Sequence, residues 1–249
     1  MTELPGLLAH LTELRQRLLR STVLVLAIFV CLVPFRDRLF TWLALPMLKH
    51  MTHGEQLIAT HVTTPFLVPF KLAFLAAVFV AVPYLLHQAW AFISPGLYKQ
   101  ERRFAMPLLV SSVLLFYAGI AFAYFVVFPI IFGFFTAVAP HGVAVMTDIG
   151  NYLDFVLTLF FAFGAAFEVP VVSVLMVRAG FTTPAALKRK RALVLISTFV
   201  IGMLLTPPDV FSQTLLAVPM YLLFELGILL SIWLVPGSRE VEAQRRGEL

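Results

Sequence analysis

The chain is too apolar and too poor in charge to be a soluble domain. It has 249 residues, of which 61% are hydrophobic and 12% charged, and its formal net charge is +5. Soluble domains are near half apolar and about a quarter charged, so a soluble enzyme, a disordered chain and a disulfide scaffold are all excluded. A single cysteine, Cys31, allows no intrachain disulfide. The composition predicts an all-α polytopic membrane protein.

Six apolar stretches are expected to be membrane helices. They cover residues 18–35, 65–93, 104–135, 152–177, 192–205 and 211–235. The first is interpreted as a retained span, because no small-residue cleavage site follows it. The fifth has 14 residues, about 21 Å of helix, and a tight turn at residues 206–209 joins it to the sixth. This hairpin predicts local thinning of the bilayer or a re-entrant arrangement.

The positive charges predict the orientation. Fourteen of them lie in the N-terminal tail, the loops after the second and fourth spans, and the C-terminal tail: Arg15, Arg17, Arg20, Lys99, Arg102, Arg103, Arg178, Lys188, Arg189, Lys190, Arg191, Arg239, Arg245 and Arg246. Only Arg36, Arg38 and Lys49 lie in loops on the other side. Cytoplasmic loops carry the excess of Lys and Arg, so both termini are expected in the cytoplasm. One six-helix domain, residues 1–235, and a polar cytoplasmic tail, residues 236–249, follow.

Motifs for catalysis, metal binding and nucleotide binding are missing from the sequence. There is no P-loop, no G-x-S-x-G elbow and no H-E-x-x-H pair. His50, His53 and His61 share the first outer loop, but no cysteine or carboxylate completes a ligand set at metal spacing, so solvated histidines are favoured. We expect no enzyme activity, no cofactor and no metal.

Two carboxylates near the cytoplasmic ends of predicted spans stand out in a basic surrounding. Glu13 precedes the first span, and Glu101 precedes the third. Glu13 could simply pair with Arg17 at i,i+4 spacing, and Glu101 could simply favour a helix N-terminus. Alternatively, both form an acidic spot that suits a paired guanidinium ligand, because Arg and carboxylate meet as bidentate forks. Such a spot argues against nucleic acid as the partner.

Two further carboxylates, Glu168 and Glu225, fall inside predicted spans. A charge at the centre of a span costs roughly 2.5–3.5 kcal/mol on insertion scales, so each needs a partner, a wet cavity or a proton. For Glu168 the candidate partners are Thr158, Ser197 and Thr198. A proton relay or a polar docking point for another helix is equally open. The alternative function is therefore a proton-coupled secondary transporter with Glu168 as its ionisable site, although the matching repeats typical of that class are missing.

Four segments, in order along the chain, resemble TatC, the core membrane subunit of the twin-arginine protein translocase. They are HLTELRQRL at residues 10–18, WAFISPGLYKQERR at 90–103, FG with FEVP within 163–170, and GMLLTPPDVFSQ at 202–213. The resemblance covers about residues 8 to 235. It implies six helices in a cupped arrangement with short fifth and sixth helices, in the bacterial inner membrane.

The resemblance also implies a function and a site. The function is export of folded proteins whose signal peptides carry paired arginines, driven by the proton-motive force. Glu13, Glu101, Arg15 and Phe92 would form the signal-peptide site. The implied partners are single-span TatA-type and TatB-type subunits, docking near Met203, Leu204, Thr206 and Gln213. Membrane lipid surrounds the chain, and self-association within the receptor complex remains open. Pro46 would belong to an outer cap.

Overall fold

The computed structural model describes residues 4–50, 58–93, 102–138, 148–205 and 209–235, and these are helical almost throughout. Within these ranges no strand forms, and β pairing is limited to one isolated bridge between Ile58 and Asp148. A helix satisfies its own backbone hydrogen bonds, which lipid cannot do for it. The predicted all-α class is confirmed.

Five stretches of the described chain are long and apolar enough to cross a membrane: Leu11–Leu43, Thr64–Phe92, Met106–Phe135, Ile149–Arg178 and Val210–Leu234. The helices that form them are α1 (Leu4–Leu32), α2 (Arg36–His50), α3 (Thr64–Ile93), α4 (Arg102–Phe122), α5 (Phe128–Val138), α6 (Ile149–Arg178) and α9 (Val210–Leu234). The remaining helices include α7 (Pro184–Arg189) and α8 (Arg191–Leu205).

The lengths of α8 and α9 differ from each other. α8 has 15 residues, about 22 Å, so the prediction of a short fifth helix is confirmed. The prediction of a short sixth helix is wrong, because α9 runs for 25 residues. Its apolar sequence continues through Pro219, and its one carboxylate, Glu225, is paired with an arginine of α8.

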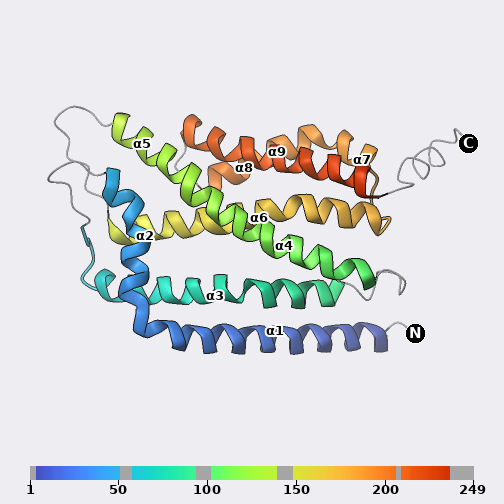
Figure 1. Cartoon of the computed structure of the whole chain (residues 1–249), viewed down its shortest axis with the longest axis horizontal. Helices are drawn as coiled ribbons and strands as arrows, with labels where there is room; N and C mark the ends of the chain where they lie inside the picture. The colour runs from blue at the N-terminus through green and yellow to red at the C-terminus, as the bar shows by residue number, and fades with distance from the viewer. Residues whose placement is uncertain (1–3, 51–57, 94–101, 139–147, 206–208, 236–249) are drawn as a thin grey trace, which may run out of the picture. The chain divides into compact units, whose positions relative to one another are not determined.

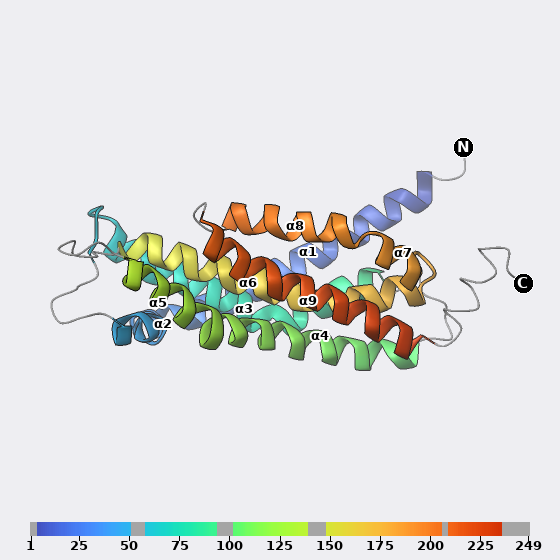
Figure 2. The ribbon, with the colours of Figure 1, turned by 90° about the horizontal axis from the view of Figure 1, so that it is seen from above.

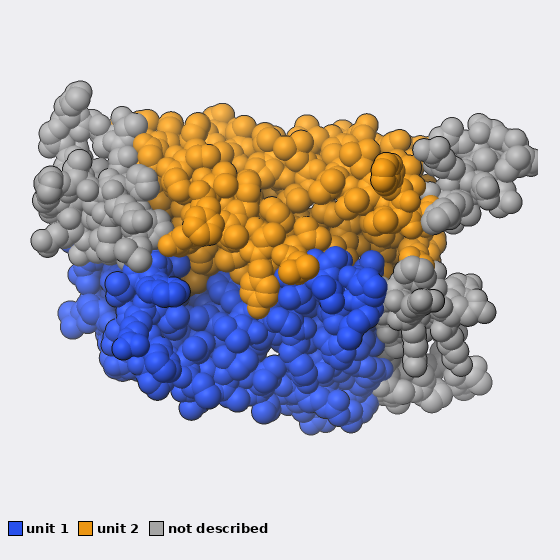
Figure 3. All heavy atoms as spheres, viewed as in Figure 1, with its two compact units in different colours: residues 1–113, 139–154 blue, residues 114–138, 155–249 orange. Residues whose placement is uncertain are grey.

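The chain divides into two compact units, coloured separately in Figure 3. Unit 1 comprises residues 1–113 and 139–154, and unit 2 comprises residues 114–138 and 155–249. The divisions fall inside α4 and α6, so each unit contains part of both helices. The predicted tail, residues 236–249, lies outside the described residues.

In unit 1, α1 packs along α3, and the two helices run side by side in Figure 1. Val25 of α1 packs against Ala77 and Ala81 of α3. Alanine is one of the small residues that are typical of contacts between membrane helices. A 3-10 turn (Val33–Phe35) separates α1 from α2, which packs back on α3. α1 begins well before the predicted span, so the segment around Glu13 continues the first membrane helix. Cys31, near the other end of α1, is exposed.

In unit 2, α8 lies along α9, as Figure 2 shows. α4 and α6 meet at a pair of glycines. A Cβ at Gly119 would lie 2.5 Å from the carbonyl oxygen of Phe163, and one at Gly164 would lie 2.7 Å from the ring of Phe116. The glycines are therefore required by the close approach of the two helices.

The third apolar stretch is interrupted between α4 and α5 by a π-helical turn, Ala123–Val127. Pro129 follows this turn and has no N–H, so it cannot donate to the carbonyl of Phe125. A wider i→i+5 turn just before the proline accommodates that loss. The sequence placed one span here and gave no sign of the interruption beyond the proline itself.

The fourth apolar stretch ends sharply at Gly180, which has a φ of 73°. Its N–H donates to Val177 O, and the N–H of Phe181 donates to Met176 O, as in a Schellman C-terminus. α7 then begins at once, with the Thr183 side chain accepting from Ala186 N and Pro184 in the first turn. The short α7 leads directly into α8.

Candidate functional site

The predicted site begins on α1 with Glu13, which lies one turn before Arg17. Arg17 Nε and Nη2 both donate to Glu13 Oε1, at 2.9 and 2.6 Å. The i,i+4 ion pair expected from the spacing is therefore confirmed. The side chains of Arg17 and Glu13 are 22% and 37% exposed, so water still reaches the carboxylate. Glu13 Oε2 takes no part in this fork.

Arg17 also connects α1 to α3, which the sequence did not predict. Its Nη1 donates to Gln88 Oε1 at 2.9 Å, and its Nη2 makes a longer contact of 3.3 Å with the carbonyl oxygen of Ala91. Gln88 is buried, so its amide oxygen depends on this bond. Only a helical-face analysis that set α1 against α3 could have found this contact.

Of the other three predicted signal-peptide residues, the structure describes Phe92 and Arg15. Phe92 follows Ala91 in the last turn of α3 and is half-buried, and Arg15 is exposed on α1. Glu101 lies outside the described residues. The structure therefore brings Glu13 to the end of α3, from which the chain continues toward Glu101 and α4.

The predicted partner face on α8 and α9 is divided between exposed and inward-facing residues. Met203 and Leu204 are 51% and 75% exposed near the end of α8. Gln213 instead turns inward, and its Nε2 donates to Phe199 O of α8 at 2.8 Å. Thr206 lies outside the described residues. Asp209 caps α9 by accepting from Ser212 N at 2.7 Å. In the structure Gln213 holds the α8–α9 hairpin, while Met203 and Leu204 face outward.

The two intramembrane carboxylates have different surroundings. Glu225 Oε2 accepts from Arg191 Nη2 at 2.5 Å, and its Oε1 accepts from the Tyr221 hydroxyl at 2.9 Å. Its charge is thus compensated across the α8–α9 contact. Glu168 is half-buried on α6, and its Oε1 atom is buried.

Two further charges inside spans also have partners, within unit 1. Lys71 of α3 forms an ion pair with Asp154 of α6. Arg36 lies over the ring of Phe70, 4.4 Å from its centroid, a cation–π contact. Pairing of this kind is what charges in an apolar environment require.

Just outside α6, Asp148 holds the start of the helix. Its Oδ1 accepts from the N–H groups of Gly150 and Asn151, and its Oδ2 accepts from the N–H and hydroxyl of Thr60. These bonds, with the Asn151 N–H as the largest influence, lower the pKa of Asp148 well below its usual range, because each favours the charged form. Sequence reasoning did not single out this residue.

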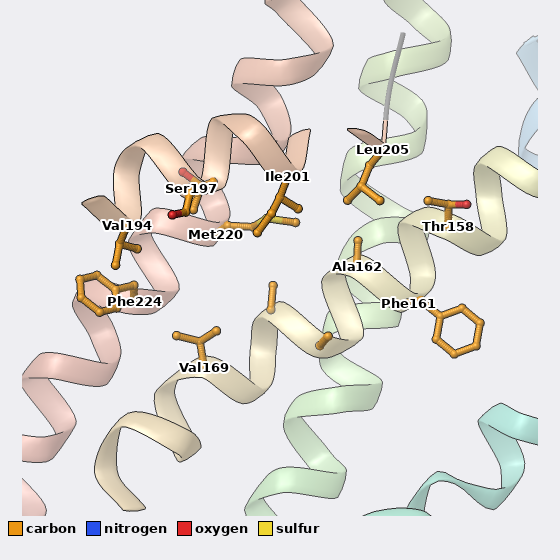
Figure 4. A pocket seen from close by; sticks show the side chains of 13 residues that line it. Thr158, Phe161, Ala162, Val169, Val194, Ser197, Ile201, Leu205, Met220 and Phe224 are labelled. Carbon is orange, nitrogen blue, oxygen red and sulfur yellow. The ribbon is translucent and has the colours of Figure 1, made fainter. Parts of the chain in front are cut away.

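Unit 2 contains an apolar groove of about 650 Å³ between α6, α8 and α9. Its lining residues are Thr158, Phe161, Ala162, Ala165, Ala166, Val169, Val194, Ser197, Thr198, Ile201, Leu205, Met220 and Phe224. Side chains of α8 and α9 face those of α6 across it (Figure 4). It has few polar groups, and no cluster of His, Cys, Asp and Glu that could hold a metal was found among the described residues.

Paired charges within long apolar helices define a multi-pass, all-helical membrane protein, and comparison with known proteins gives its family. The model of the Sec-independent protein translocase protein TatC family matches residues 9–219. The chain belongs to this family, which is a protein-transport family rather than an enzyme family. It is a multi-pass protein of the bacterial inner membrane.

Individual relatives and solved structures agree. The Sec-independent protein translocase protein TatC of Azotobacter chroococcum is 60% identical over 89% of this chain and 87% of its own length. That of Escherichia coli K12 is 54% identical over 95% and 92%. A crystal structure described as the twin-arginine translocase receptor TatC is 37% identical, with a TM-score of 0.81 over 90% of this chain and 98% of its own.

Proposed function

We propose that this chain is the receptor subunit of a twin-arginine translocase and binds the arginine pair of signal peptides at the rim formed by α1 and the end of α3. Glu13 and Glu101 supply the negative charge, and Arg15 and Phe92 flank them. The single observation that carries the proposal is the placement of Glu13. Its carboxylate pairs with Arg17, which also contacts the carbonyl oxygen of Ala91 in the last turns of α3.

The chemistry fits a guanidinium ligand. Glu13 Oε2 is outside the Arg17 fork, and the side chain is 37% exposed, so an incoming donor can reach it. Charge-assisted hydrogen bonds contribute about 1.5–3 kcal/mol each, and less where water screens them. An arginine fork suits a carboxylate better than the point charge of lysine.

The proposed topology places this rim in the cytoplasm. The six spans include the short α8, and the excess of Lys and Arg in alternate loops puts both termini on the same side. A folded passenger then meets the receptor where it is made. Without a nucleotide motif in the sequence, a transmembrane gradient is the proposed energy source.

TatA-type and TatB-type subunits are proposed to dock along α8 and α9. The supporting observation is the exposure of Met203 and Leu204 beside an apolar groove. A cysteine at either position, in a chain whose Cys31 is replaced by alanine, should crosslink to a single-span subunit. Val23→Cys on α1, 65% exposed, is the matched control. Equal crosslinking from the control position would contradict this docking face.

The test of the signal-peptide site is crosslinking to a synthetic signal peptide in membranes containing the assembled complex. The Glu13→Gln/Glu101→Gln double variant should lose about ten-fold or more of the crosslink, since two charge-assisted contacts disappear. Asp37→Asn, which neutralises an 83% exposed carboxylate of α2, is the control and should retain it. A double variant that crosslinks like the parent would overturn the assignment.

A further inference from the structure

One arginine of the chain already occupies the carboxylate that the proposed signal-peptide site uses. Arg17 places two nitrogens on Glu13 Oε1, at 2.9 and 2.6 Å. This is the same guanidinium-to-carboxylate chemistry by which a signal arginine would be recognised. One of the two carboxylate oxygens of Glu13 is therefore already bound by a guanidinium group of the chain itself.

The internal arginine is held in place from the other side. Gln88 Oε1 accepts from Arg17 Nη1 at 2.9 Å, and the carbonyl of Ala91 lies 3.3 Å from Nη2. Both acceptors belong to α3, so Arg17 spans the two helices. Because Gln88 is buried and uncharged, this hold does not neutralise the guanidinium. Of the three groups that Arg17 contacts here, Glu13 is the one whose charge compensates the guanidinium.

This arrangement affects what an incoming cation gains. Glu13 and Arg17 together carry no net charge, and Arg15 and Arg20 add positive charge on the same stretch of α1. A second guanidinium gains the full attraction of Glu13 only when Arg17 gives up its share of the carboxylate. The apparent affinity is then reduced by the fraction of time that Glu13 is released.

We propose that Arg17 is an internal competitor that sets the affinity of the signal-peptide site without setting its preference for arginine. The proposal rests on the proposed function, since it concerns binding of the arginine pair at Glu13. Any cation, arginine or lysine, must meet the same competition. Removing Arg17 therefore raises the affinity for twin-arginine and twin-lysine peptides by one common factor and leaves their ratio unchanged.

The experiment measures binding of fluorescent twin-arginine and twin-lysine signal peptides to membranes containing the assembled complex. Arg17→Gln should tighten both peptides by the same factor, roughly two-fold, the change expected for a partly exposed i,i+4 ion pair. Gln88→Met keeps the charge of Arg17 but loosens its hold, and should produce a smaller change in the same direction. Arg20→Gln removes an exposed arginine one turn further along α1 and controls for long-range charge.

Several outcomes would overturn the proposal. Weaker binding in Arg17→Gln would make Arg17 part of the receptor, and unchanged binding, or an equal gain in Arg20→Gln, would leave no role for competition at Glu13. A change in the arginine-to-lysine ratio would make Arg17 a recognition residue. Loss of folding in Arg17→Gln is monitored by thermal unfolding, and Gln88→Met provides a second route to the same competition.

A double variant separates this proposal from the proposed function. In Glu13→Gln, the further change Arg17→Gln should have no effect, because the competitor has lost its target. If Glu13→Gln alone leaves binding unchanged, the proposed site is wrong. If Glu13→Gln weakens binding while Arg17→Gln does nothing, the site stands and the competition fails.

Discussion

The α1–α3 contact of unit 1 and the α8–α9 contact of unit 2 each use an arginine and a glutamate, but in different ways. On α8 and α9 the two charges sit on different helices, so the ion pair Arg191–Glu225 itself joins them, in addition to the bond from Gln213 to Phe199 O. On α1 both charges share one helix, and the link to α3 runs from Arg17 to Gln88. Glu225 is thus part of the contact between its helices, whereas the bond that joins α1 to α3 does not involve Glu13, so a change of partner at Glu13 would leave that bond in place.

The largest effect is expected from Arg191→Met. This change leaves Glu225, whose side chain is 22% exposed, with the hydroxyl of Tyr221 on the same helix as its remaining described partner. Leaving a largely buried carboxylate without its cation should cost roughly 2–3 kcal/mol of unfolding free energy. Thermal unfolding in nanodiscs measures it. The double variant Arg191→Met/Glu225→Leu should recover most of the loss, and no recovery would mean that the pair is not the cause.

A smaller effect is expected from Gln88→Leu. The change removes the buried acceptor for Arg17 Nη1, while the Glu13 fork and the Ala91 carbonyl remain. Loss of one such hydrogen bond should cost about 1 kcal/mol, read by the same unfolding assay. A loss as large as that of Arg191→Met would contradict the claim that the α1–α3 contact tolerates changes of partner.

The effect of Glu13→Gln on stability should be smaller still. A partly exposed i,i+4 pair contributes about 0.3–0.5 kcal/mol, and the bond from Arg17 to Gln88 survives the change. The unfolding midpoint should therefore barely move, although peptide binding falls. A stability loss that matches the binding loss would place Glu13 in the packing and remove the contrast with Glu225.

The most local effect is expected when low pH protonates Asp148, which lies outside the spans. Because its folded pKa is lowered, its contribution is fully present above the ordinary value of 3.8 and is lost as the pH falls below that value. Hydrogen exchange at the Gly150 and Asn151 amides should accelerate at pH 3 relative to pH 6, after correction for intrinsic rates. Asp148→Asn should remove this acceleration, and an acceleration that persisted would assign it to another group.

The sequence predicted the helices well and the side-chain contacts poorly. The second span, predicted at residues 65–93, is observed as α3 at Thr64–Ile93, because hydropathy and backbone satisfaction both act locally. The short α8 followed from residue count alone. The π turn before Pro129 could not be predicted from residue count, because it depends on how the backbone compensates for the missing N–H of one proline.

The candidate site shows the same limit. Spacing was enough to pair Glu13 with Arg17, since both lie on one helix face. Pairing Arg191 with Glu225, or Arg17 with Gln88, requires knowing which helices are neighbours and at what register. For Glu225 the sequence left proton relay and docking open, and the structure gives it an arginine partner instead.

The lone exposed thiol of Cys31 makes these questions accessible to spectroscopy. It lies on the same helix as Glu13, about 27 Å away at 1.5 Å per residue. That separation is within the working range of fluorescence energy transfer. A donor dye on the natural cysteine could report, in otherwise unaltered protein, when an acceptor-labelled ligand arrives at the opposite end of α1.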